Sequence, residues 1–250
     1  MIESKEAVIV AAREFFEASS SYEETRWRPM WKDDLRFRAL DQWPESMVNL
    51  RKQNTTTNEL ARPMLVVDQT DQYVRQVVND ARLNPPALQA QPMDDRADIE
   101  VAKALQGLFR HIERVSRAQA AYLTALEWAV VTGRGFFRVY SHPVDVARNL
   151  YEPRIGRVAN ALQVYFDEYS AGIDGSEATD AMYVQEFSDR AFKAEFPKAE
   201  ATASWDGEDS DWRRKDTVRV AEWHSVRKVE QLVVVTVDGE MTPEQAKERG

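Results

Sequence analysis

The sequence contains no cysteine and only three histidines. Without cysteine the chain can form no disulfide, no thiolate metal site and no cysteine nucleophile. The histidines, His111, His142 and His224, are scattered along 250 residues and do not suggest a histidine metal cage. We therefore expect neither a metal ion nor a cofactor.

Long apolar runs are also missing. No segment approaches the roughly 20 consecutive apolar residues that a membrane-spanning helix needs. The apolar patch near the N-terminus is flanked by acidic residues, and no small-residue cleavage site of a signal peptide follows it. We expect no association with a membrane.

Positive charge is in deficit. The chain has 33 Lys and Arg against 42 Asp and Glu, which gives a formal net charge of −9 and a pI of about 5.1. Such a surface repels phosphate groups, which argues against a general nucleic-acid binder. A local basic patch is still compatible with this balance.

Apolar residues are sufficient for a core, at 43% hydrophobic and 10% aromatic. Helical spacing of these residues predicts a helix over 3–19 and one long helix over 57–83, about 37 Å in length. The prolines that follow Asn84 end the long helix, and "ALQAQP" (87–92) then predicts a short edge strand.

Two further helices are predicted between residues 98 and 133. Ser116 is the expected N-terminal cap of the second helix, and Gly133 is its expected C-terminal stop. Because the joint between them is so short, the two helices are expected to form a helical hairpin.

The second half of the sequence is dominated by predicted strands, with one short helix that begins at Ser188 and ends at Pro197. The strands are expected at 134–141, 161–166, 181–188, 217–226 and 229–239. The fold class is therefore α+β, with a mainly helical part over 1–133 and a mostly antiparallel β part over 134–241.

Three tryptophans stand close together near the N-terminus: Trp27, Trp31 and Trp43. A free surface rarely carries so many large aromatic side chains, so they predict packing against another element or another chain. We interpret them as candidate subunit-interface residues.

Three arginines, Arg110, Arg114 and Arg117, lie near the joint of the predicted hairpin. A helix-turn-helix DNA reader is one interpretation of this pattern, in which the 98–133 hairpin acts as a small DNA-binding adaptor. The second helix is almost wholly apolar, however, and a recognition helix needs polar side chains. We add the arginines to the candidate interface residues and keep the adaptor as an alternative.

Acidic residues gather over 167–180, at Asp167, Glu168, Asp174 and Asp180. A metal-dependent nuclease is the second alternative, but the spacing of a calcium loop is absent and solvated turn residues are the default interpretation. No nucleophile, base or oxyanion stabiliser forms a catalytic set, so we expect no enzymatic activity.

The order of several motifs resembles the portal proteins of short-tailed bacteriophages. The motifs are "DDLRFRALDQWP" (33–44), "NELARPMLVVDQTDQYVRQVVNDARLNPPALQAQP" (58–92), "AYLTALEWAVVTGRGFFRVYSH" (121–142), "YFDEYSAGIDGSEATDAMYV" (165–184) and "RVAEWHSV" (219–226). The resemblance thus extends over most of the chain.

The resemblance implies a non-enzymatic structural subunit of a twelve-membered portal ring at a capsid vertex, through which double-stranded DNA is packaged and ejected. It implies terminase as a partner during packaging, tail proteins afterwards, and contacts with capsid and scaffolding proteins. The protein would be in the host cytoplasm during assembly and in the virion afterwards.

Portals of this family divide into wing, stem, clip and a crown or barrel. The resemblance implies that residues 1–250 are the N-terminal part of the wing, without stem, clip and crown. The chain would then be a truncated portal or a remnant reading frame, and we expect a monomer or weak oligomer.

Overall fold

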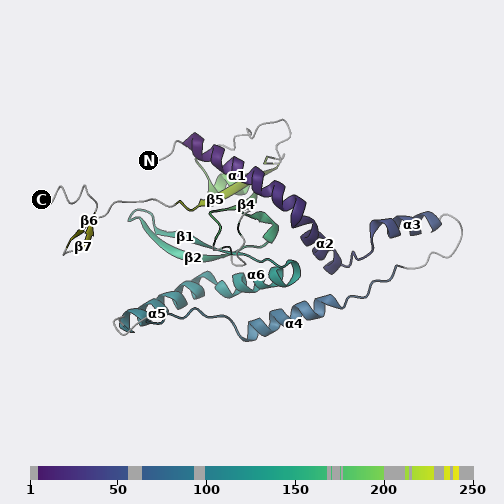
Figure 1. Cartoon of the computed structure of the whole chain (residues 1–250). Coiled ribbons are helices and arrows are strands. Elements are labelled where there is room, and N and C mark those ends of the chain that lie inside the picture. The colour runs from purple at the N-terminus through teal and green to yellow at the C-terminus, as the bar shows by residue number, and fades with distance from the viewer. Residues whose placement is uncertain are drawn as a thin grey trace. The chain divides into compact units, whose positions relative to one another are not determined.

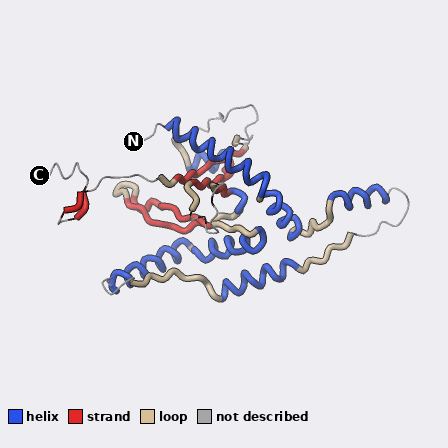
Figure 2. The backbone as a smooth tube through the Cα atoms, in the orientation of Figure 1, coloured by secondary structure: helices blue, strands red, loops and turns tan. Residues whose placement is uncertain are grey.

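The computed structural model describes residues 5–55, 64–92, 99–167, 170, 175, 177–199, 212–213, 216–227, 234–236 and 239–241 (Figure 1). Two compact units are formed: unit 1 from residues 1–19 and 166–250, and unit 2 from residues 20–165. Helices precede residue 133, apart from one helix and a short 3-10 turn, and all described strands follow it (Figure 2). The predicted α+β class, with a helix-rich first half, is confirmed.

Helix α1 (Lys5–Arg26) begins in unit 1 and ends in unit 2. It passes through "SSSYEE", where the sequence predicted an end at residue 19. Trp27 separates it from α2 (Arg28–Arg38), whose Pro29 stands in the first turn, where a missing N–H leaves no hydrogen bond unmade. Helix α3 (Glu45–Thr55) follows.

The long helix predicted over 57–83 is wrong. Helix α4 (Thr70–Leu83) has 14 residues, about 21 Å at 1.5 Å per residue, and residues 64–69 are not helical. The side chain of Asp68 fixes the start, because its Oδ1 accepts hydrogen bonds from the backbone N–H groups of Thr70 (2.9 Å) and Asp71 (3.3 Å). The predicted end is confirmed, whereas the cap expected at residues 57–58 lies outside the described residues.

The short strand predicted at 87–92 is also wrong. Residues 85–92, which we call the strap, belong to no strand and cross beside helix α5 (Ile99–Ser116). The side-chain amide of Gln106 takes the place of a neighbouring strand: its Oε1 accepts from the N–H of Ala90, and its Nε2 donates to the carbonyl of Leu88, both at 2.8 Å. One side chain therefore holds the strap to α5.

Helices α5 and α6 (Ala118–Thr132) do not form the predicted hairpin. Their contacts with strand β2 and the residues just after it advance in one direction along the chain: His111 to Glu152, Ser116 to Ile155 and Trp128 to Ala159. The helices thus follow one another along the strand, with a bend between them (Figure 1). The bend needs only one residue, because Arg117 adopts left-handed backbone angles.

Strands β1 (Phe137–Asp145) and β2 (Leu150–Arg157) form an antiparallel ribbon in which Val139 faces Ile155. Strand β1 was predicted from the sequence, whereas strand β2 was missed. Ile155 packs on Ala118 and Ala121 of α6, whose small side chains allow helix and ribbon to approach closely. Gly133 ends α6 with φ 81°, as predicted.

Charged side chains tie unit 2 together at two places. Arg28 and Glu23 form a buried ion pair at 2.9 Å, and Arg28 also donates to the carbonyl of Leu162 at 2.8 Å. Arg38 of α2 reaches Asp71 of α4 at 3.2 Å and Glu127 of α6 at 2.7 Å. The hydrogen bond to Glu127 is the main cause of a raised pKa at Arg38.

In unit 1, strands β4 (Asp180–Ser188) and β5 (Thr217–Ser225) pair antiparallel, and Phe166, the last residue of β3 (Val164–Phe166), belongs to the same sheet. The Ser188 hydroxyl caps α7 (Asp189–Glu195), as predicted, and α7 buries Phe192.

Strands β6 (Val234–Thr236) and β7 (Gly239–Met241) pair with each other. The helix predicted at "TPEQAKER" (242–249) lies outside the described residues. Within the described ranges, no helix combines the length and apolar character required to cross a bilayer.

Candidate functional site

The three tryptophans do not share one environment. Trp31 is only 5% exposed and lies in the core of unit 2. The guanidinium of Arg134 lies 5.6 Å from the ring centre of half-buried Trp27 and 5.9 Å from that of Trp31. Trp43 is also half-buried and stacks instead with Arg51 of α3, at 4.8 Å. Their role at a subunit interface stays a prediction, and the buried ring of Trp31 stabilises the chain's own fold.

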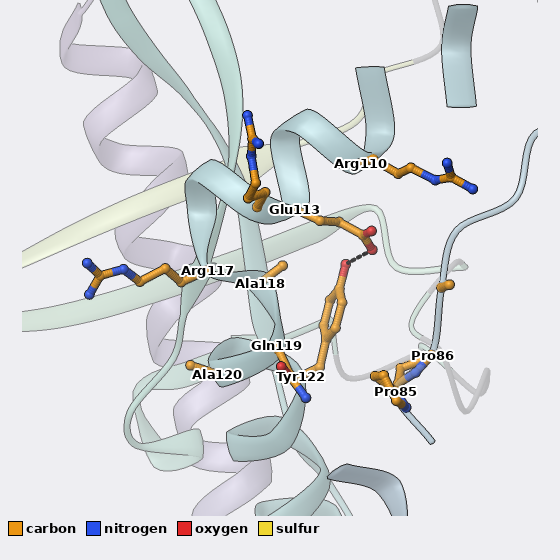
Figure 3. Close-up of a pocket in the computed structure, with 11 residues that line it drawn as sticks. Pro85, Pro86, Arg110, Glu113, Arg117, Ala118, Gln119, Ala120 and Tyr122 are labelled. Atoms are coloured by element: carbon orange, nitrogen blue, oxygen red, sulfur yellow. Dashed lines mark hydrogen bonds between the residues drawn. The ribbon is translucent and has the colours of Figure 1, made fainter. Parts of the chain in front are cut away.

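The three arginines are brought together around one cavity of about 590 Å³. Arg110 and Arg114 come from the last turns of α5, and Arg117 from the bend before α6. Pro85 and Pro86 of the strap also line the cavity, and Figure 3 shows them on the side of Tyr122, with the Arg117 side chain extending away from them. Sequence reasoning found the arginines but missed that the strap would lie across from them.

One carboxylate of this cavity is turned inward. Glu113 accepts a hydrogen bond from the hydroxyl of Tyr122 at 3.3 Å, and Figure 3 shows the two side chains pointing toward each other. Burial, with a smaller contribution from the negative charge of Glu113, raises the pKa of Tyr122. Tyr122 therefore remains a protonated donor at neutral pH.

The backbone of Arg117 is strained. Its φ of 52° and ψ of 44° lie in the left-handed region, which costs a residue with a side chain roughly 1–2 kcal/mol. Ser116, the predicted cap of α6, instead accepts a hydrogen bond from the N–H of Ile155 at 3.0 Å. The bend is thereby fixed to the ribbon at the residue next to the strain.

A second cavity, of about 690 Å³, continues along the strap. It shares Ala87, Arg110 and Glu113 with the first cavity and adds Lys103 and Gln106 of α5. We call the two cavities together the basic groove. Its described lining contains four cations, Lys103, Arg110, Arg114 and Arg117, and one carboxylate, Glu113. This composition suits the binding of an anion, and the lining offers no nucleophile with an adjacent base.

The acidic residues of 167–180 are only partly described, since Glu168 and Asp174 lie outside the described residues. The hydroxyl of Thr179 lies 2.9 Å from carboxylate oxygens of both Asp167 and Asp180. In the described part of the chain, no group of three or more His, Asp or Glu side chains is arranged to hold a metal ion.

Comparison with known proteins gives two matches. The phage P22-like portal protein family matches residues 13–249. A portal protein of Acyrthosiphon pisum secondary endosymbiont phage 1 is 26% identical over 199 residues, which cover 73% of this chain and 26% of that protein. The chain thus spans about a quarter of the length of this relative. Both matches confirm the resemblance read from the motifs.

Proposed function

The chain belongs to the phage P22-like portal protein family, and from this premise we propose that it contributes to a twelve-membered portal ring. The ring would stand at one vertex of the capsid and conduct double-stranded DNA during packaging and ejection. The portal family is structural and not an enzyme family, so this chain would function through contacts with neighbouring subunits.

Within the ring, we assign residues 1–250 to the N-terminal part of the wing. Terminase would dock during packaging and tail proteins afterwards, with capsid and scaffolding proteins as further partners. Assembly in the host cytoplasm would place the protein in the virion.

The exposed apolar surface of the described residues is the observation that carries this proposal. Among these residues, 29 large hydrophobic side chains are exposed, whereas 12 hydrophobic side chains are buried. Soluble monomers expose single apolar side chains routinely, but contiguous apolar stripes mark interaction surfaces. The chain therefore presents much of the surface that a subunit buries against neighbours.

Helix α5 carries one such stripe. Val101, Leu105 and Leu108 are 52%, 43% and 46% exposed. Their spacing of four and three residues places them on one helical face, as in helices that pack against a partner helix. We assign this face, together with Trp43, to contacts between subunits.

A double substitution in the full-length portal tests this assignment. Leu105→Glu with Leu108→Glu places two charges on the apolar stripe, and burial of an unpaired charge at an interface is strongly unfavourable. We expect that electron microscopy of the variant shows no rings, while circular dichroism shows an unchanged helix content.

A matched control places two glutamates at exposed, polar positions of α7, Arg190→Glu with Lys193→Glu. This variant should form rings as the parent protein does. Rings of normal yield from the α5 variant would contradict the assignment of the stripe.

A further inference from the structure

The cations of unit 2 differ in whether the fold provides them with a carboxylate. Arg36, Arg38 and Arg75 each lie within 3.2 Å of an aspartate or glutamate oxygen. Lys103, Arg110, Arg114 and Arg117 are exposed and form no ion pair with any other residue that the structure describes. In a chain of net charge −9, such a group forms a local positive patch that can attract an external anion.

Three of these cations lie on α5, and the fourth, Arg117, lies at the bend after the end of the helix. Lys103, Arg110 and Arg114 are spaced at seven and four residues, which places these three in one stripe of the helix. This stripe is about 17 Å long at 1.5 Å per residue. The position between the first two cations is Gly107, which has no neighbouring atom within 4 Å of where a Cβ would stand. The helix surface is therefore open at this position.

The opposite wall of the groove is apolar and close. Pro85, Pro86 and Ala87 line one end of it and Leu88, Ala90 and Pro92 the other. Because the single side chain of Gln106 reaches from α5 to the backbone of the strap, the two walls are about one side chain apart. Where Gln106 bridges the walls, the space between them is too narrow for a helix of about 10 Å diameter.

The geometry points to the basic groove as a docking site for an extended acidic segment of another protein. Carboxylates of the segment would pair with the arginines, each of which can donate two parallel hydrogen bonds to one carboxylate. Its backbone and apolar side chains would contact the proline-rich wall. This inference goes beyond ring assembly, because it assigns the groove to a partner of a different chain.

Two other occupants fit less well. A DNA duplex is wider than the space between α5 and the strap, and its phosphates would meet an apolar wall and an acidic protein. A second copy of this chain would have to supply an extended acidic segment. Asp33 and Asp34, two described carboxylates without an ion pair, lie on helix α2 and so cannot supply one.

Glu113 does not prevent such docking. Its carboxylate is turned toward Tyr122, while Figure 3 shows the side chains of Arg110 and Arg117 extending in opposite directions. Exposed arginine side chains change rotamer within nanoseconds, so both guanidinium groups can close on a ligand. Four cations then face the ligand against one inward-turned carboxylate.

Fluorescence anisotropy with the whole 250-residue chain tests the inference. The probe is a labelled peptide of alternating glutamate and proline, which is extended by its own preference. The variant Arg110→Ala/Arg114→Ala/Arg117→Gly should bind it at least about tenfold more weakly, because each exposed ion pair contributes up to roughly a factor of five. The control Arg190→Ala/Lys193→Ala/Lys198→Ala removes three exposed cations of unit 1 and should bind as the parent does.

A second variant separates a groove from a mere patch of charge. Gln106→Ala keeps every cation and removes both hydrogen bonds to the strap. If the strap is a wall of the site, affinity for the peptide should fall roughly threefold, the loss of part of one hydrogen bond.

Each contrary result overturns the inference. Equal loss of peptide binding in the two triple variants would show that net charge alone acts. Tighter arginine-dependent binding of a DNA duplex than of the peptide, at equal salt, would make the groove a nucleic-acid contact. Self-association of the parent chain that is lost in the arginine variant would make a second copy the occupant.

Discussion

Arginines of unit 2 serve two different purposes, and the contrast between Arg38 and Arg114 shows them. Arg38 lies between α2, α4 and α6 and reaches carboxylates on two of these helices, so its charge is used within the fold. Arg114 lies on α5 without any carboxylate within ion-pair distance among the described residues, and it faces the basic groove. The difference indicates that a basic residue stabilises the fold when its partner is internal and is available for docking when it has none.

The largest effect is expected where an internal pair is completely buried. Arg28→Ala removes the buried ion pair with Glu23 and the hydrogen bond to Leu162. We expect the free energy of unfolding to fall by about 3–5 kcal/mol in urea titrations. The exposed pair of Lys32 with Glu24 is the control, and Lys32→Ala should change stability by less than about 1 kcal/mol. Similar losses in both variants would contradict the distinction.

A smaller loss is expected where the internal pair is partly exposed. Arg38→Ala removes the contacts with Asp71 and Glu127, which join three helices. Because these side chains are partly solvated, we expect a loss of about 1–2 kcal/mol in the same titration. Arg114→Ala, which removes an unpaired cation, should leave the unfolding curve unchanged. A larger effect at Arg114 than at Arg38 would reverse the comparison.

Substitution of Arg117 is expected to change the stability of the chain in the opposite direction. Glycine adopts its left-handed backbone angles without strain, which recovers roughly 1–2 kcal/mol, while the added freedom of the unfolded glycine costs roughly 0.5–1 kcal/mol. Arg117→Gly should therefore stabilise the chain slightly, by about 0.5 kcal/mol, and Tm should rise. Arg114→Gly, inside the helix, should lower Tm instead. A fall of Tm for both would show that the Arg117 side chain stabilises the fold.

The smallest effect is a dependence on pH at the start of α4. Backbone hydrogen bonds from Asp71 and Thr70 lower the pKa of Asp68 below its ordinary value of 3.8. A depressed folded-state pKa contributes stability above the unfolded value, and this contribution is lost as pH falls through the folded value. The Tm difference between the parent chain and Asp68→Asn should thus be constant at neutral pH and shrink below pH 3.8. A difference that grows in acid would contradict this sign.

Much of the fold could be predicted from local pattern. The strands around Val139 and Val184 and the cap at Ser188 follow from alternation and side-chain hydrogen bonding, which act over a few residues. Strand β2 was missed because Pro153 and several charged residues hide its alternation, and its pairing depends on β1. Helix α4 was predicted too long because the apolar spacing continues before it, whereas the side chain of Asp68 accepts hydrogen bonds from Thr70 and Asp71 just ahead of the helix.

The candidate site was predictable only in part. The arginines could be read from the sequence because their spacing is local. The position of the strap could not be predicted from the sequence, since it depends on the side chain of Gln106, 16 residues beyond Ala90. A joint between two helices was predicted at Ser116, but its bent geometry was not, because no glycine marks the left-handed position of Arg117.

Light scattering tests the central claim, that this chain acts through contacts with neighbouring subunits, most directly. The masses of the 250-residue chain and of the full-length portal, each purified alone, would be compared at equal concentration. We predict a monomer or weak oligomer for the 250-residue chain and a closed ring of twelve for the full-length protein. A full-length protein that remains a monomer at every concentration would contradict the account.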